Sequence, residues 1–270
     1  MQRFQMERIR SLSDLPKLHE FECAVQMEIA NTNGREDAFL RNSSGLSMLF
    51  KVLGHEHGRP YFRYVLREVF GEKSTLYHKP ASPTQVREYA RSVIERLEKA
   101  LHFAPLVLRT CCQLALKEFQ KAFPESTQDM KIVIGGVLFL RILCPALIKP
   151  ELLGFQPHTP RSLPAGVQIA KMLQHTLNGS LLSENHPEFA EGNVFITTFQ
   201  PHVASFLAQF PQVRASLPQE SPKSAEVLCV KPWDIESAPP TPNSSKLRNM
   251  SLAPSEPVKQ KRKFSFRFWR

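Results

Sequence analysis

The stretch KIVIGGVLFLRILCPALIKP, residues 131–150, carries no acidic residue and only one charged residue, Arg141, between its terminal lysines. Its apolar residues fall on every side of a helix, and a helix that is hydrophobic all round is a buried one. We therefore predict a core helix at about 130–144. The longest apolar run, residues 132–148, contains Arg141 and Pro145 and is shorter than the roughly 20 residues that a bilayer requires, so we do not predict a transmembrane segment.

Arg141 is the anomaly of this stretch. An arginine cannot shed its charge when it is buried, so it must be paired or donate to backbone carbonyls. The residues alone leave two readings: an ion pair that only holds the fold together, which is the commoner case, or a functional duty that repays the cost of burial.

The rest of the first two hundred residues also repeats apolar positions at helical spacing, without sustained period-two alternation. The predicted fold class is all-α. Pro105 and Pro164 suit the first turns of helices, where a missing N–H costs nothing. An amphipathic surface helix is predicted from an apolar stripe formed by Val86, Tyr89, Val93, Leu97 and Leu101. The expected helices span about 14–28, 45–54, 61–70, 84–103, 105–123, 130–144, 164–177 and 195–210.

The last sixty residues differ in composition. From Gln212 onward they are rich in Pro and Ser and hold eleven Lys or Arg against five Asp or Glu, while the whole chain has a formal net charge of +10. Such a segment buries too little apolar surface to offset the entropy of ordering it. We predict a helical domain at 1–211 and a basic, disordered tail at 212–270. Because the body is only mildly basic, nucleic-acid binding by it is not expected.

The five cysteines show neither paired spacing nor a CxxC motif, and the amino terminus has no apolar run typical of a signal peptide. A reduced, cytoplasmic protein is therefore expected. His55, Glu56 and His57 are close in sequence, but residues i and i+2 point to different faces of a helix, so no metal site is predicted.

Three segments resemble the catalytic domain of Ras GTPase-activating proteins in the order in which that family has them. Residues 139–146, FLRILCPA, match the signature FLRxxxPA; upstream, LVLRTCCQLALKEFQKAFPES resembles the preceding helix. Downstream, IAKMLQHTLN resembles IAKxxQNxAN at Lys171, Gln174 and Asn178. The resemblance covers roughly residues 21–210.

A fourth match lies near the amino terminus. EIANTNGREDAFLRNSSGLS resembles the stretch that ends in LFRGNSLAT, and an ungapped alignment puts Arg41 on the family's arginine finger. It also puts Ser44 and Ser47 on small hydroxyl residues. The chain departs from the family at Asn42 and Met48, and at Gly45, which we expect to weaken the following helix by about 1 kcal/mol relative to alanine.

The resemblance implies an activator that supplies Arg41 in trans to a GTP-bound Ras-family GTPase, with Arg141 steadying the finger loop through backbone hydrogen bonds. A guanidinium stays charged and offers a planar fork of donors to the phosphate oxygens on which negative charge develops. The resemblance further implies that the GTPase is bound by residues including Leu140, Lys171, Gln174, Asn178, Ser44 and Ser47. The residues leave open that Lys171 is merely solvated and that Asn178 caps its helix before Gly179.

No GxxxxGK[ST] motif occurs, so no nucleotide site or cofactor of the chain's own is expected; GTP and Mg²⁺ belong to the partner. The chain is accordingly expected to be a GTPase activator rather than an autonomous enzyme. The alternative is a catalytically weak scaffold that binds GTP-bound Ras and carries a membrane-binding tail. At the carboxy terminus basic and aromatic residues interleave, which suits an anionic membrane such as the inner face of the plasma membrane, or else a nuclear-import signal. This patch comprises Lys261, Arg262, Lys263, Arg267 and Trp269.

Overall fold

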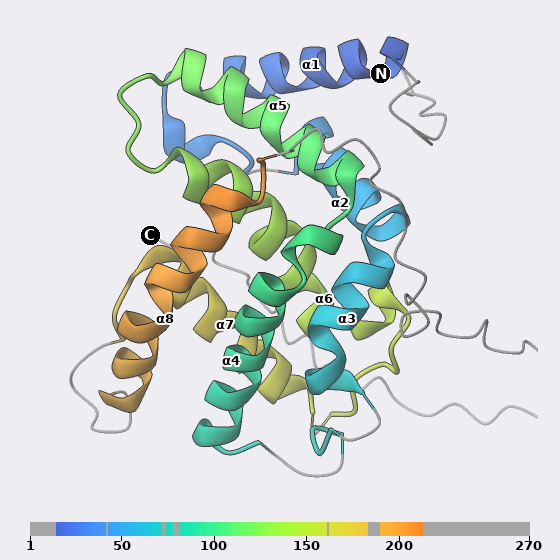
Figure 1. The fold of residues 1–270 in the computed structure, drawn as a ribbon, viewed down its shortest axis with the longest axis vertical. Coiled ribbons are helices and arrows are strands. Elements are labelled where there is room, and N and C mark those ends of the chain that lie inside the picture. Colours follow the sequence, from blue (N-terminus) through green and yellow to red (C-terminus); the bar gives the residue numbers. More distant parts are fainter. Residues whose placement is uncertain are drawn as a thin grey trace, which may run out of the picture. The chain divides into compact units, whose positions relative to one another are not determined.

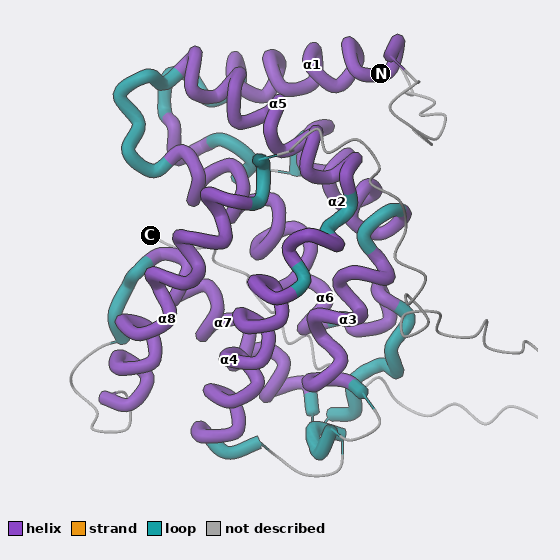
Figure 2. The backbone as a smooth tube through the Cα atoms, in the orientation of Figure 1, coloured by secondary structure: helices purple, strands orange, loops and turns teal. Residues whose placement is uncertain are grey.

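The computed structural model describes residues 15–41, 43–71, 74–77, 81–160, 162–182 and 190–212. These ranges contain helices and loops and no strand (Figure 2), which confirms the all-α class. Contacts within the chain divide it into two units, Met1–Ala215 and Ser216–Arg270. The second unit, with the basic patch at its end, lies outside the described residues, so the tail and the boundary at 211 and 212 stay predictions.

All eight expected helices are present, with ends that shift by up to five residues. They are α1 (Leu15–Ala30), α2 (Gly45–Glu56), α3 (Arg59–Phe70), α4 (Pro83–Lys99), α5 (Leu106–Ala122), the segment η3 (Lys131–Leu143) that continues into α6 (Cys144–Ile148), α7 (Leu163–Asn178) and α8 (Ala190–Gln209). Pro164 lies in the first turn of α7 as predicted. Pro105 instead precedes the first residue of α5, as its N-cap.

The predicted core helix is the centre of the domain. η3 contacts α2, α5, α7 and α8, and its residues from Val133 to Phe139 are all buried. It winds more loosely than an α-helix, because its N–H groups donate to carbonyls five residues earlier, as Cys144 does to Phe139. The combined helix Lys131–Ile148 is long and apolar enough to cross a membrane, but 72% of it is buried inside the domain. It is the core helix of this domain.

The surrounding helices form two groups, one toward each end of the domain (Figure 1). α1 packs on α5 and α2 at one end, and α3, α4, α7 and α8 pack against one another at the other. The predicted stripe of α4 is largely confirmed: Val86, Val93 and Leu97 are buried, while Tyr89 and Leu101 are partly buried. α4 therefore presents its charged side to solvent as predicted.

Candidate functional site

The loop that joins α1 to α2, residues 31–44, carries Arg41 and is fastened to the core by the two residues before it. The rings of Phe39 and Phe119, on α5, meet edge to face with centroids 5.0 Å apart. Leu40 is 3% exposed, and its side chain packs over Gly136 of η3. A Cβ added at Gly136 would lie 3.7 Å from Leu40 Cδ1. In Figure 1 this blue segment after α1 turns back beside α5. The α1–α2 loop is thus anchored directly behind Arg41.

Leu40 adopts a left-handed backbone conformation, with φ of +55°. A bulky residue avoids this region at a cost of about 1 to 2 kcal/mol, and such strain persists only where the surroundings impose it. The Leu40 N–H donates to Glu28 Oε1 at 3.0 Å, across twelve residues of sequence. Glu28 lies in the last turns of α1 and is only 5% exposed.

The side chain of Arg41 leaves the α1–α2 loop toward solvent. It is 51% exposed, and its Nη1 donates to Asp37 Oδ2 at 2.7 Å. An exposed ion pair of this kind contributes about 0 to 1 kcal/mol, because water competes for both groups. Arg41 is therefore free to exchange Asp37 for a stronger anion at little cost.

Arg141 lies on η3, at the edge of the core. It is half-buried rather than fully buried, so the prediction of complete burial is corrected: the helix is apolar all round up to Phe139, and the arginine emerges where it meets the surface. Burial lowers the pKa of Arg141 below the usual guanidinium value, and the negative charge of the nearby Glu28 opposes that shift. Among the described residues no hydrogen bond joins Arg141 to the α1–α2 loop.

η3, in which the FLRILCPA motif begins, and α7 pack together beside the α1–α2 loop. At Gly135, the neighbour of Gly136, an added Cβ would approach Leu177 Cδ1 to 2.7 Å, so a side chain there would have to displace Leu177 of α7. η3 therefore receives the α1–α2 loop and α7 at adjacent residues. Leu140, one turn further along η3, is partly exposed. The elements that carry the predicted site residues are in contact.

The predicted α7 residues differ in their surroundings. Lys171 and Asn178 are exposed, and Lys171 forms no ion pair with any residue that the structure describes. The cap of α7 is Gly179, in the left-handed conformation with φ of 65° and its N–H bonded to His175 and Thr176, so Asn178 is not needed for that role. Gln174 is half-buried near the Cys144 thiol, which donates to the Ala170 carbonyl at 3.7 Å and whose pKa burial raises to about 12.

The two predicted serines build the start of α2. Ser44 is its N-cap, and the Ser47 N–H donates to Ser44 Oγ at 3.2 Å while Ser47 Oγ donates to the Ser44 carbonyl at 2.9 Å. Ser47 is 0% exposed. It is therefore out of reach of a partner, and its predicted place on the binding surface is corrected to a structural one: these hydroxyls fix where the α1–α2 loop ends.

Glu28 is the residue that the sequence analysis missed. Its only signal was a carboxylate at a position that the helix buries, in the stretch MEIA, and its hydrogen bond to Leu40 depends on a left-handed turn that no residue pattern announced. A glutamate buried this deeply needs a partner for its charge, and the structure provides the Leu40 N–H, with the positive charge of Arg141 nearby.

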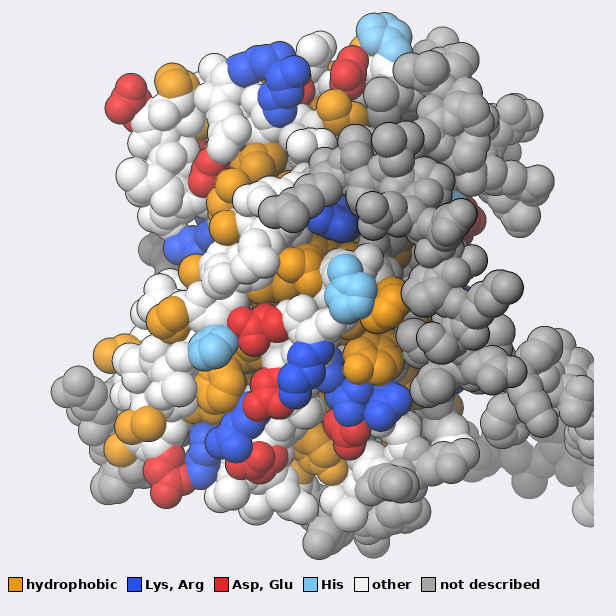
Figure 3. Space-filling view, viewed as in Figure 1, with side chains coloured by type: hydrophobic (Ala, Val, Ile, Leu, Met, Phe, Trp, Pro, Cys, Tyr) orange, Lys and Arg blue, Asp and Glu red, His pale blue; other side chains and the backbone are white. Residues whose placement is uncertain are grey.

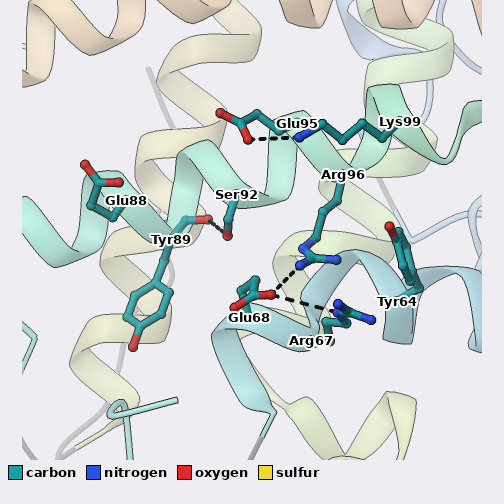
Figure 4. A pocket seen from close by; sticks show the side chains of 9 residues that line it. All are labelled: Tyr64, Arg67, Glu68, Glu88, Tyr89, Ser92, Glu95, Arg96 and Lys99. Atoms are coloured by element: carbon teal, nitrogen blue, oxygen red, sulfur yellow. Dashed lines mark hydrogen bonds and ion pairs between the residues drawn. The ribbon is translucent and has the colours of Figure 1, made fainter. Parts of the chain in front are cut away.

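A concavity lies between α3 and α4, on the face shown in Figure 3, where basic and acidic side chains alternate. Glu68 lies between Arg67 and Arg96, both of which also lie over the ring of Tyr64 (Figure 4). The basic residues that line this concavity form ion pairs with its glutamates. None of the predicted site residues lines it. No group of three or more potential metal ligands occurs among the described residues.

The comparisons with known proteins agree with this arrangement. The model of the family "GTPase-activator protein for Ras-like GTPase" matches residues 72–178, a range that includes η3 and α7. Over this range the chain resembles the RasGAP family. The match begins after the α1–α2 loop, so Arg41 rests on the ungapped alignment and on the loop geometry.

Similar proteins carry related names. The chain is 26% identical over 203 residues to the RAS protein activator like-3 of Mus musculus, covering 70% of this chain and 19% of that protein. It is 28% identical over 229 residues to the RasGAP-activating-like protein 1 of the same species, covering 70% and 28%, and 26% identical over 139 residues to the Ras GTPase-activating protein 1 of Bos taurus, covering 51% and 13%. The chain thus spans less than a third of the length of these relatives.

Proposed function

We propose that this domain stimulates GTP hydrolysis on a Ras-family GTPase in its GTP-bound form by inserting Arg41 into the partner's active site. The observation that carries the proposal is the construction of the α1–α2 loop. Two buried residues, Phe39 and Leu40, fix the backbone next to an arginine that is half-exposed and that, among the described residues, pairs only with Asp37 at the surface. An anchored backbone that carries a weakly paired, exposed guanidinium suits the delivery of positive charge to another molecule.

The chemistry requires such a cation. During phosphoryl transfer, negative charge builds on the phosphate oxygens, and a positioned guanidinium from a second protein accelerates the reaction about 10³- to 10⁵-fold, equivalent to roughly 4 to 7 kcal/mol of barrier. The domain thereby acts as a GTPase activator, and the partner brings GTP and Mg²⁺. Preorganised electrostatics of this kind act in the transition state, so Arg41 contributes to rate more than to affinity.

The proposed docking surface consists of the exposed parts of η3 and α7 beside the α1–α2 loop, with Lys171, Asn178 and Leu140 as contacts. Lys171, which pairs with no described residue, would meet acidic groups of the GTPase. Gln174 would act at its edge, because its side chain is half-buried.

The alternative, a scaffold that binds GTP-bound Ras without catalysis, is not favoured, because it gives no reason for the strained and anchored backbone next to Arg41. We further propose that the chain is cytoplasmic and that Lys261, Arg262, Lys263, Arg267 and Trp269 attach it to anionic lipid at the inner face of the plasma membrane. This tail surface lies outside the described residues, and the proposal rests on its composition.

The direct test of the activity is single-turnover GTP hydrolysis by a panel of Ras-type GTPases with and without the full chain. We expect at least a hundredfold stimulation of one or more members at saturating activator. Tight binding to a GTP-bound partner without stimulation would favour the scaffold, and neither binding nor stimulation across the panel would refute the proposal.

A further inference from the structure

The strained residue next to Arg41 is held by a group on a different helix. Leu40 has a positive φ, its side chain is buried, and its N–H points to Glu28 Oε1 at 3.0 Å. A turn residue in this conformation cannot keep its N–H in a helical ladder, and a buried N–H without a partner costs about as much as a lost hydrogen bond. The Glu28 carboxylate supplies that partner.

We propose that Glu28 is the positioning residue of the α1–α2 loop: its carboxylate holds Leu40 in the left-handed conformation and so sets the direction in which Arg41 leaves the domain. The next peptide unit after Leu40 carries Arg41, so a change in the Leu40 backbone swings the arginine directly. Glu28 acts through Leu40 and touches neither nucleotide nor partner.

The same carboxylate also interacts electrostatically with Arg141 on η3. Glu28 is 5% exposed, so its charge needs compensation inside the domain. Arg141 is close enough to interact with that charge, and it makes no hydrogen bond to a described residue of the loop. The Arg141 charge therefore lies near the carboxylate that accepts the Leu40 N–H.

Two variants separate the parts of this mechanism. Glu28→Ala removes both the acceptor for Leu40 and the charge that faces Arg141. Glu28→Gln keeps an acceptor oxygen of the same reach and loses the charge, leaving a neutral hydrogen bond that is about half as strong. Glu20→Ala, an exposed glutamate on the same helix, is the matched control.

The first readout is amide hydrogen exchange of residues 36–41 in the free full-length chain, which needs no GTPase. We expect Leu40 to lose most of its protection in Glu28→Ala, to exchange about tenfold faster in Glu28→Gln as the weaker bond implies, and to be unchanged in Glu20→Ala. Unchanged exchange at Leu40 in Glu28→Gln would overturn the proposal even if Glu28→Ala fails to fold.

The second readout is stimulated hydrolysis, and it rests on the proposed function. At saturating activator we expect the rate to fall about 100-fold in Glu28→Ala and less than tenfold in Glu28→Gln, with affinity for the GTP-bound partner kept within several-fold, because misplacement by about 1 Å costs this much in rate. Full activity of a folded Glu28→Ala would overturn the positioning role. If the wild-type chain stimulates no GTPase, the proposed function fails, while the exchange measurement still decides the role of Glu28.

Discussion

At the scale of single residues, Arg41 is poised rather than engaged. Within the described part of the chain its one partner is Asp37, four residues earlier, and both side chains are more than half exposed. A phosphate group offers more charge and a better fit to the guanidinium fork than a solvated carboxylate does. Asp37 therefore competes weakly with the proposed substrate for Arg41.

This competition predicts the effect of Asp37→Asn. Removing the carboxylate charge should leave the stimulated rate unchanged or raise it by up to about fivefold, since an exposed ion pair is worth at most about 1 kcal/mol. The measurement is single-turnover hydrolysis at low ionic strength, where the pair is strongest. A fall of more than tenfold would mean that Asp37 positions Arg41 instead of restraining it.

Lys171 offers a test of the docking surface. Lys171→Glu should weaken association with the GTP-bound partner by about tenfold or more, while the rate at saturation stays near that of the wild type, because a like-charge contact acts on binding. Lys99→Glu is the control, since it makes the same change in net charge on α4, where Lys99 lies beside Glu95. Equal losses of affinity in both variants would indicate general electrostatic steering. Lys171 would then be a solvated cation outside the docking surface.

At the scale of elements, the surroundings of two helical glycines differ. Gly45 lies at the first position of α2, with open space around its Cα, so the helix-interior penalty expected from the sequence does not apply. Gly166 lies inside α7, where an added Cβ would come within 2.3 Å of the Leu147 carbonyl oxygen of α6. The two positions make opposite demands on a side chain.

These surroundings predict opposite signs for two alanine substitutions. Gly45→Ala should stabilise the domain by about 0.4 to 1 kcal/mol, because it restricts the unfolded chain and meets no atom in the folded one. Gly166→Ala should destabilise it by about 1 to 3 kcal/mol through overpacking against a backbone atom. Urea unfolding measures both, and a stabilising Gly166→Ala would contradict the packing of α7 on α6.

Helix periodicity was enough to predict the long helices that the structure describes, because most apolar stripes are long, but not the short 3-10 helices at Glu36–Ala38 and Pro150–Leu153. Helix ends were less predictable: α3 begins at Arg59, two residues early, since Pro60 fits its first turn. Of the site, the exposure of Lys171 followed from its polar helix face. The burial of Ser47 and the bond between Glu28 and Leu40 could not be predicted, because both depend on a loop whose path is set by tertiary contacts.

At the scale of the molecule, the charge of the chain is unevenly distributed. The segment from Gln212 onward holds eleven of the 35 basic residues and only five of the 25 acidic ones. A tail of this composition would concentrate the domain at the membrane that carries its proposed substrate, since each cation near an anionic leaflet contributes about 1 kcal/mol.

The proposed attachment predicts a difference between two chains in vesicle co-sedimentation. The full chain should sediment with vesicles that contain phosphatidylserine and stay largely in solution with neutral ones, whereas a chain that ends at Pro257 should stay in solution with both. Both chains should stimulate a soluble GTPase equally. Equal sedimentation of the two on anionic vesicles would exclude the tail as the anchor.

The central claim is that Arg41 acts in the transition state of a reaction on another protein. The measurement that tests it is single-turnover GTP hydrolysis at saturating activator with wild-type, Arg41→Ala and Arg41→Lys chains, together with their affinities for the GTP-bound partner. We predict that Arg41→Ala lowers the stimulated rate about 10³-fold, that lysine restores little of it, and that both variants bind within several-fold of the wild type. A stimulated rate within tenfold of the wild type in Arg41→Ala would contradict the account.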